Sequence, residues 1–464
     1  MSSFLFRNRQ VKVAEHCKLR SFASFPIDGK EEENSVFSNM NYIISNIFLL
    51  LFIALQPCFG QKEKKPQVMV YGSDFLAFSV AVQSAKSSVP TILLVDGDQL
   101  MPEFSSGRIE METMPHVDSG IWMDILMEMA LAKSPSDSLA AAVKHDMSPR
   151  LFENAIEKVL GRLPDLTVMR GEEVLSITKR KRDWEIQISS KHKYNVRSIV
   201  DASQKQELST LADISWSDSV ERMRPLHTLS LAQLRTSVAV GELDNTLHSV
   251  LLEDILVGEK DGFFNFRSTR EILSDDVALT PFRAAIGQAV GATAAYLAFF
   301  KTSADKVDVR TLQTELITYG ARILPFQDIA IDDRYFYVLQ RFGLASILPN
   351  LHVEKSFLFH KEERVGFNEV EPVFDRLYSR AQLWFLDNEG DYFRWKDFLS
   401  LIKFVGLRGE NIDKQIEKEW SSKLGFEGDF DLEAFVNRYQ FAVIVDMYAN
   451  PYVKAVNQQG EFVN

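Results

Sequence analysis

The stretch VMVYGSDFLAFSVAVQSAKSSVPTILLVD, residues 68–96, decides the fold of this chain. Residues 68–72 form an apolar strand that ends at a glycine, and residues 74–86 carry apolar side chains at helical spacing. Residues 91–95 are a second apolar run, as expected for a strand whose two faces are both covered. The segment between the strands is long enough for a right-handed βαβ crossover. The sequence therefore predicts an α/β fold built on a parallel sheet.

The turn after the first strand has the position of a dinucleotide-binding loop, but only part of its composition. Such loops carry small residues at the first, third and sixth places, so that a pyrophosphate can reach the helix N-terminus. Gly72 holds the first place, Asp74 the third and Ala77 the sixth, with Ser73 in between. We expect Asp74 to cap the helix with its own carboxylate and so to occupy the place of the pyrophosphate.

Four motifs in chain order resemble the FAD-dependent oxidoreductases of the glutathione-reductase-type fold, in the heterodisulfide-reductase-like branch. They are VMVYGSDFLA from Val68, ILLVDGDQL from Ile92, IVDASQKQELSTLA from Ile199 and AAIGQAVGATAAYLA from Ala284. The resemblance covers about residues 66–210 and 251–350. It implies a Rossmann-like FAD/NAD(P)-binding fold with a β-meander insertion.

The resemblance also implies which residues would contact FAD. Asp96 would hold the ribose hydroxyls of the adenosine, and Gly287 and Gly291 would pass close to the isoalloxazine. The full implied set is Gly72, Ser73, Ala77, Asp96, Ser105, Ser106, Gly107, Asp201, Ala202, Gly287 and Gly291. No catalytic residue follows from the resemblance, although His116 and Arg283 lie near the segments that would contact the flavin.

The departures from the family fall where the cofactor would touch the chain. Besides Asp74, residues 101–103 (MPE) replace paired glycines, and Gln204 to Gln206 replace the glycines of the third motif. One interpretation is a flavin oxidoreductase with weak cofactor binding that acts on an unknown substrate. A second is a non-catalytic binding protein that kept the fold and lost FAD. A third is a surface-attachment protein whose active part is its C-terminal helical module.

Composition excludes several other functions. The net charge of −12 argues against a nucleic-acid partner, because phosphate binding needs a basic face. The only cysteines are Cys17 and Cys58, so no disulfide and no iron–sulfur cluster is expected in the folded part. The histidines show no HExxH or HxxxH pair, and we expect no metal site. The expected partner is a small molecule or a saccharide.

Residues 40–60 resemble a secretory signal peptide. Residues 43–55 are apolar, have the length of its central region and are too short for a comfortable membrane span. Gly60 offers the small residue that cleavage needs, and the mature chain would begin at Gln61. The protein is therefore expected to be periplasmic or secreted, with no membrane span after cleavage.

Three further expectations concern this end of the chain. Residues 1–39 precede the export signal, and we interpret Met40 as the true start. An uncleaved anchor helix is one alternative to cleavage. The other is a lipoprotein acylated at Cys58, although Gln56 and Pro57 stand where small residues are expected.

The chain divides into five predicted segments. These are a leader with signal peptide (1–60), an FAD-binding-like domain (61–210 and 251–305), a shortened remnant of a substrate domain (211–250), a helical extension (306–350) and a mostly helical module (351–464). Within the second segment we expect strands at 166–170, 174–179, 184–189 and 194–200, the last three forming the β-meander.

Overall fold

The computed structural model describes residues 65–463, except 106, 108, 113, 215–222, 266–272, 274–275, 349–351, 354–355, 407–408 and 410. The side chains of residues 115, 352 and 353 are also outside the description. The predicted leader and signal peptide lie outside the described residues. Residues 65–464 form one unit by their internal contacts.

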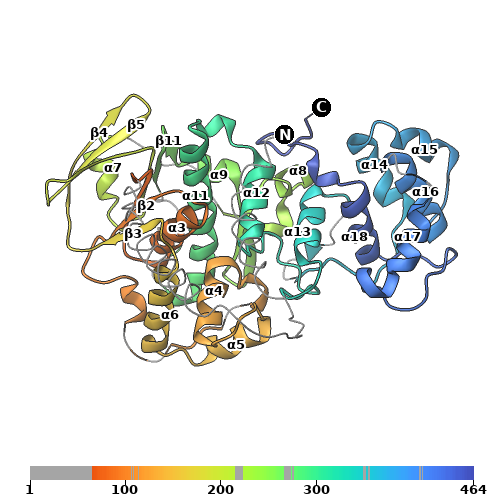
Figure 1. The fold of residues 1–464 in the computed structure, drawn as a ribbon, viewed down its shortest axis with the longest axis horizontal. Coiled ribbons are helices and arrows are strands. Elements are labelled where there is room, and N and C mark those ends of the chain that lie inside the picture. Colours follow the sequence, from red (N-terminus) through yellow and green to blue (C-terminus); the bar gives the residue numbers. More distant parts are fainter. Residues whose placement is uncertain are drawn as a thin grey trace, which may run out of the picture. The chain divides into compact units, whose positions relative to one another are not determined.

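A six-stranded sheet in the order β11-β12-β7-β1-β2-β3 contains the first motif (Figure 1). Its central strand β1 (Val68–Tyr71) pairs in parallel with both β2 (Thr91–Leu94) and β7 (Ser198–Asp201). The outer strands are β3 (Leu166–Met169) and β12 (Phe263–Asn265), both parallel to their neighbours, and the short antiparallel β11 (Glu259–Lys260). The predicted α/β fold with a parallel sheet is confirmed.

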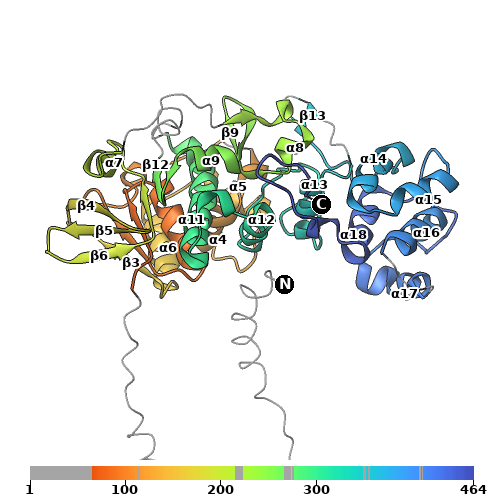
Figure 2. The same ribbon diagram turned by 90° about the horizontal axis from the view of Figure 1, so that it is seen from above.

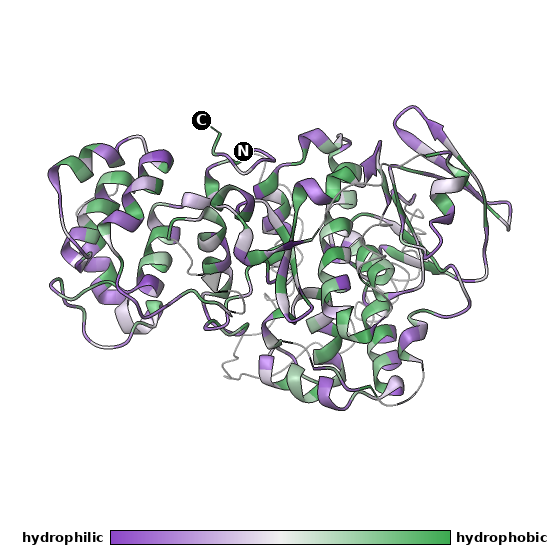
Figure 3. Ribbon diagram, turned by 180° about the vertical axis from the view of Figure 1, so that it is seen from behind, coloured by the Kyte–Doolittle hydropathy of each residue, from purple (hydrophilic) through white to green (hydrophobic). Residues whose placement is uncertain are grey.

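Two largely apolar helices, α3 (Phe75–Lys86) and α11 (Thr280–Phe300), pack closely against each other (Figure 3). A Cβ atom at Gly287 would lie 2.6 Å from the carbonyl oxygen of Leu76, and one at Gly291 would lie 2.4 Å from that of Val80. Such distances are shorter than van der Waals contact. Both glycines are therefore required by the approach of the two helices, whether or not a cofactor is present.

The predicted β-meander is divided between two sheets. β4 (Val174–Arg180), β5 (Asp183–Ile188) and β6 (Lys193–Val196) form a separate antiparallel sheet, seen in Figure 2. The prediction of one strand over 194–200 is wrong, because the chain changes partners at Arg197. Val196 is the last residue to pair with β5, whereas Ser198 is the first to pair with β1.

The segment interpreted as a shortened remnant of a substrate domain, residues 211–250, contains most of another antiparallel sheet, in the order β8-β10-β9. Its strands are β8 (Arg224–Pro225), β9 (Ser237–Leu243) and β10 (Thr246–Leu251). Gly241 of β9 lies under the ring of Phe282, where a Cβ atom would come within 2.1 Å of the ring carbon Cγ. The glycine therefore lets the first turn of α11 dock on this sheet.

The other helices and strands complete the described part of the chain. They are α4 (Gly120–Met129), α5 (Asp137–His145), α6 (Pro149–Gly161), α7 (Glu207–Leu211), α8 (Leu231–Leu234), α9 (Leu252–Val257), α12 (Val309–Thr318), α13 (Phe336–Ala345), β13 (His352–Val353), β14 (Ser356–Phe357), α14 (Phe367–Leu377), α15 (Ala381–Asp387), α16 (Trp395–Gly406), α17 (Ile412–Glu419) and α18 (Arg438–Tyr448). Among these residues, no helix combines the length and the apolar character needed to cross a membrane.

The C-terminal module contains a three-fold internal repeat. Each of α14, α16 and α18 follows a short loop, and the middle residues of these loops are Val365, Phe393 and Val436, all fully buried. Val365 N donates to Val436 O at 3.2 Å, Val436 N to Phe393 O at 3.0 Å, and Phe393 N to Val365 O at 2.9 Å. These bonds close a ring, so each loop supplies one donor and one acceptor.

A second set of backbone hydrogen bonds connects the same three units in the opposite direction. Each helix donates its first N–H to a carbonyl that lies just before the next loop. The bonds are Phe367 N to Asp391 O, Trp395 N to Ala434 O and Arg438 N to Glu363 O. The module is therefore built from three copies of one loop–helix unit, and the helices of these units, α14, α16 and α18, are labelled in Figure 1.

Candidate functional site

The N-terminus of α3 is capped by the carboxylate of Asp74. Its Oδ1 accepts a hydrogen bond from Ala77 N at 3.0 Å, and the residue is 6% exposed. This is the local interaction that the sequence predicts. The N–H groups in the first turn of such a helix are the ones that would otherwise bind an anion.

A second carboxylate reaches the same helix end from the loop after β2. Glu103 lies in the short 3-10 helix η1 (Pro102–Phe104), and its Oε1 accepts from Phe75 N at 3.4 Å. The buried guanidinium of Arg283 lies on the other side, 3.8 Å from the same oxygen. The backbone of the same loop makes a further contact, because Met101 N donates a hydrogen bond to Ser73 O at 2.6 Å. The loop thus contacts the segment between β1 and α3 at two points.

The position of Glu103 is set by its neighbour Phe104. That ring stacks on Phe152 at a centroid distance of 4.0 Å and packs near Phe75 and Trp122. Phe104 is 2% exposed, so the aromatic cluster holds η1 against α3. Because the loop is anchored by apolar packing, an incoming pyrophosphate would have to displace more than one carboxylate.

Burial has a strong effect on the Glu103 carboxyl. The loss of solvent raises its pKa to about 7, although the charge of Arg283 acts in the opposite direction. The nearby carboxylate of Asp74 adds to the rise. Near neutral pH, Glu103 therefore exchanges between its charged and neutral forms.

A pocket of about 690 Å³ lies at the carboxyl ends of the parallel strands. Ligands of open α/β folds bind at this edge of the sheet. The last residue of β1, Tyr71, lines the pocket together with residues that follow β2, β3 and β7. Its charged residues are Asp96, Asp98, Glu172, Glu173, Lys205 and Glu207. Five carboxylates against one ammonium group make the pocket strongly negative.

In the FAD site that the resemblance implies, the residues at the nucleoside end suit the cofactor, whereas those at the pyrophosphate end do not. Asp96 lies in the pocket, where it can accept hydrogen bonds from vicinal hydroxyls such as those of a ribose. At the α3 N-terminus, by contrast, Asp74 and Glu103 already accept from the N–H groups that a pyrophosphate would need. The described residues therefore fit the nucleoside end of FAD and do not fit its pyrophosphate.

Several other predicted site residues serve the fold itself. A Cβ atom at Gly72 would lie 2.7 Å from the carbonyl oxygen of Ala202, so this glycine permits the close approach of the ends of β1 and β7. Asp201 is fully buried and accepts hydrogen bonds from Ser203 and Ser209, which fixes the loop and helix after β7.

Of the remaining predicted residues, Ala77 and Ala202 are fully buried and Ser73 is half-buried. Ser105 and Gly107 are exposed, and Ser106 lies outside the described residues. Of the two residues noted near the flavin segments, Arg283 pairs with Glu103. His116 is half-buried, and its pKa is lowered by burial and by the charge of Arg322. Neither lines the pocket at the carboxyl edge.

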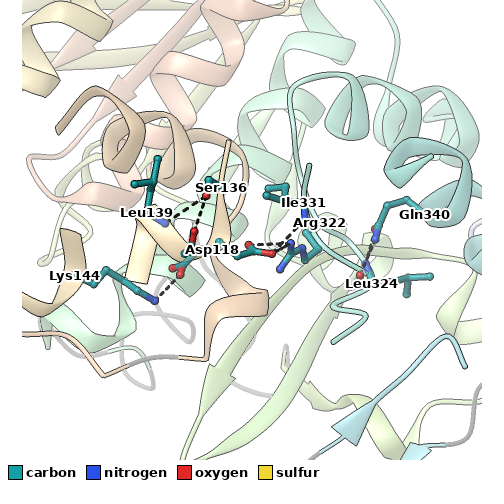
Figure 4. A network of polar contacts seen from close by, with 10 residues as sticks. Asp118, Ser136, Leu139, Lys144, Arg322, Leu324, Ile331 and Gln340 are labelled. Carbon is teal, nitrogen blue, oxygen red and sulfur yellow. Dashed lines mark hydrogen bonds and ion pairs between the residues drawn. The ribbon is translucent and has the colours of Figure 1, made fainter. Parts of the chain in front are cut away.

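A buried polar network contains Arg322, whose charge also acts on His116 (Figure 4). Lys144 is 2% exposed and forms an ion pair with Asp118, whose other oxygen accepts from the indole N–H of Trp122 at 2.9 Å. Arg322 pairs with Asp137 at 3.1 Å. Each of these charges has an opposite charge beside it, and the network ties α5 to the chain around residue 322.

Comparison with known proteins gives limited information. No protein-family model matches the chain, and no curated protein is similar to it. Among solved structures, it resembles a bacillithiol disulfide reductase from Staphylococcus aureus over 30% of this chain and 38% of that chain, with 14% identity and a TM-score of 0.21. A thioredoxin reductase from Lactococcus lactis matches over 30% and 35%, with 19% identity and a TM-score of 0.21.

A p-nitrophenol 4-monooxygenase from Pseudomonas putida matches over 55% of this chain and 87% of that chain, with 9% identity and a TM-score of 0.30. The chain thus spans little more than a third of the length of the two reductases. Similarity at this level carries no argument about function, which has to come from the site.

Proposed function

We propose that this protein binds a small phosphate-free ligand in the pocket at the carboxyl edge, on a fold like that of FAD-dependent oxidoreductases. The observation that carries the proposal is the pair of carboxylates on the N-terminus of α3. Asp74 and Glu103 hold the N–H groups that would bind a pyrophosphate. The pocket at the carboxyl edge is large enough for a nucleoside or a small saccharide.

The negative charge of the pocket favours uncharged ligands over ligands that carry phosphate. Carboxylates accept hydrogen bonds from hydroxyl groups, whereas they repel phosphate groups. Asp96 and Glu207 lie on this surface together with Lys205, the one cation among the described residues that line it. A neutral ligand with several hydroxyl groups therefore suits the pocket better than a nucleotide does.

Calorimetric titration of the chain with adenosine, AMP and ADP tests this proposal. We expect adenosine to bind about tenfold more tightly than ADP, because each added phosphate brings negative charge toward the carboxylates. Asp96→Asn should weaken adenosine binding, whereas Asp308→Asn, a change in a helix cap of α12, should leave it unchanged. Tighter binding of ADP than of adenosine would show that the carboxylates do not set the preference.

The second candidate is a flavin oxidoreductase that holds FAD weakly. The place of Asp96 in the pocket favours it, because the same position suits the adenosine of FAD. The visible absorption of the purified protein separates the two candidates. A protein that purifies with stoichiometric flavin is a flavoprotein, and the proposal of a phosphate-free ligand then fails.

FAD binding by the wild type should depend on pH through Glu103. The pKa of this carboxyl is raised to about 7, so its charge is lost as the pH falls through 7. We therefore expect FAD, whose phosphates do not titrate here, to bind up to about tenfold more tightly at pH 6 than at pH 8. Fluorescence titrations should show this change in the wild type and a flat profile in Glu103→Gln. An equally steep profile in the variant would assign the effect to another group.

The same raised pKa affects stability. Because the folded state favours protonated Glu103, the stabilising contribution of this carboxyl is present at low pH and is lost as the pH rises through 7. Denaturant unfolding of the wild type and of Glu103→Gln, measured between the usual pKa of a glutamate, 4.5, and about pH 7, gives that contribution.

We further propose that the protein is exported, on the strength of the apolar run at residues 43–55. The mature chain is expected to begin at Gln61. N-terminal sequencing of protein recovered from its native host checks this. A folded protein that still carries residues 1–39 would contradict both the start site and the cleavage.

A further inference from the structure

The turn between β4 and β5 is strongly basic in a protein that is acidic as a whole. Residues 179–182 read KRKR, whereas the net charge of the chain is −12. Arg180, Lys181 and Arg182 are all exposed. Arg180 pairs with Glu185 at 3.3 Å. Among the described residues, no carboxylate lies within 4.0 Å of the charged groups of Lys181 and Arg182.

The side chain of Arg197 places this turn beside the end of α11. Its guanidinium donates to the carbonyl of Arg182 and, at 2.6 Å, to that of Thr302. The backbone N–H of Arg197 donates to the carbonyl of Gln67, the residue before β1, at 2.8 Å. The basic turn, the end of α11 and the start of β1 therefore meet at the amino edge of the parallel sheet, the edge at which β1 and β7 begin.

Two exposed aromatic rings lie at the same edge. Phe299 and Phe300 are the last two residues of α11, and they are 43% and 36% exposed. Phe300 packs on Tyr296 with 4.5 Å between the ring centres, and Phe299 lies edge-on to Phe300 at 5.1 Å. Lys301, which follows them, is exposed as well. An aromatic pair and a lysine thus stand beside the basic turn.

These residues have the composition of a surface that meets a lipid bilayer. Aromatic side chains are enriched at the level of the lipid headgroups, where one part of the side chain is in an apolar environment. Lysine and arginine are attracted by the negative potential of anionic lipids, and each contributes about fivefold to binding. We call the set the amino-edge surface, and its members are Arg180, Lys181, Arg182, Phe299, Phe300 and Lys301.

The chain that precedes β1 favours a bilayer over other anionic partners. Residues 61–65, QKEKK, add three lysines and one glutamate next to the amino edge. The apolar run of the proposed export signal ends at residue 55, and residues 56–67, twelve in all, join it to β1. Twelve residues span at most about 40 Å when they are fully extended. Before cleavage, a membrane that holds the apolar run is therefore within this distance of the amino-edge surface.

We propose that the amino-edge surface binds to the surface of a membrane that contains anionic lipids. Its four cations face the headgroups, and the rings of Phe299 and Phe300 enter the headgroup layer. The rest of the chain is acidic, so the lipids repel its other faces and the orientation is fixed. The pocket at the carboxyl edge lies at the other end of the strands and points away from the bilayer. The two proposals therefore stand or fall separately.

Co-sedimentation with vesicles tests the proposal. The chain from Gln61 is suitable, because it contains the whole compact unit of residues 65–464 and lacks the apolar run. It should bind vesicles made of equal parts of phosphatidylglycerol and phosphatidylcholine, and it should not bind phosphatidylcholine alone. Binding should weaken as sodium chloride rises from about 0.05 M to about 0.5 M, because salt screens exposed charges. No binding to the anionic vesicles, or equal binding to the neutral ones, overturns the proposal.

Charge variants at the two ends of the same small sheet locate the contact. Lys181→Gln combined with Arg182→Gln should weaken binding to the anionic vesicles about twentyfold, since two cations are lost. Lys191→Gln combined with Lys193→Gln is the matched control. It removes the same charge at the β5–β6 turn and the start of β6, and it should keep the affinity. All four side chains are exposed, so both variants should fold. An equal loss in the two variants would mean that no particular surface is used.

A tryptophan reporter tests whether the rings enter the bilayer. Phe299→Trp should be quenched by brominated lipids in the anionic vesicles, with the wild type as the reference for the native tryptophans. Leu211→Trp is the matched control, because Leu211 is also 43% exposed but lines the pocket at the carboxyl edge, and it should not be quenched. Binding without quenching at position 299 overturns the proposal. If single-stranded DNA or polyglutamate then binds in its place, the surface recognises polyanions.

Discussion

The variant that combines Asp74→Gly with Glu103→Gln is expected to bind ADP at least about a hundredfold more tightly than the wild type. Two unit charges about 4 Å apart at an effective dielectric constant near 20 repel by about 4 kcal/mol, or about a thousandfold in affinity. Both carboxylates lie at the α3 N-terminus, and screening by water lowers the full effect. The variant also frees the N–H group of Ala77 to bind phosphate, whereas the glutamine at position 103 keeps an oxygen that can accept from Phe75 N but carries no charge. Calorimetry with ADP and fluorescence titration with FAD measure the gain.

The two single variants and one control show where the gain comes from. Asp74→Gly alone should give about tenfold or more, and Glu103→Gln should add to it. Asp308→Asn makes a similar change at the cap of α12, where Asp308 accepts from Thr311 N at 2.7 Å, and it should leave ADP affinity unchanged. If the combined variant binds ADP no better than the wild type does, the carboxylates are not the barrier. The ordinary flavoenzyme interpretation would then be preferred.

Replacing Asp118 by alanine is expected to lower the free energy of unfolding by about 3–5 kcal/mol, because it leaves the ammonium group of Lys144 buried without a partner. Denaturant unfolding measures the change. The variant that combines Asp118→Ala with Lys144→Met should recover most of the loss, since no charge then stays in the interior.

An exposed ion pair provides the comparison for Asp118. Lys396 and Glu433 lie 2.7 Å apart, and their side chains are 48% and 61% exposed. Glu433→Ala should therefore cost no more than about 1 kcal/mol. A similarly small cost for Asp118→Ala would mean that Lys144 finds solvent or another partner when Asp118 is lost.

The features that the sequence predicted are local ones. The βαβ unit follows from apolar runs of fixed length, and the cap at Asp74 joins residues three positions apart. The contact between Glu103 and Phe75 spans 28 positions and comes from a loop without periodicity. The only sign of this contact in the sequence was the acidic residue Glu103, which stands where the flavin oxidoreductases that the chain resembles have glycine. The change of strand partners at Arg197 could not be predicted for a related reason, because the apolar pattern that predicts a strand continues through this residue.

Contacts between distant parts of the chain show a similar limit. The sequence does not reveal that Arg235, Arg310 and the aromatic residues of the C-terminal segment meet, since up to 227 positions separate them. The three-fold repeat was also missed. Its loops are unequally spaced along the chain, and the shared positions agree only in being apolar, as Val365, Phe393 and Val436 do.

The ring of hydrogen bonds at these three loops has a consequence for truncated chains. A chain that lacks one unit would keep one unpaired N–H and one unpaired carbonyl at the break, much like the exposed edge of a sheet. A second copy could supply the missing loop, which is the route by which domain swapping makes dimers. Closure of the ring within one chain therefore leaves these three loops without an unpaired backbone group for a second copy to bind, in addition to holding three helices together.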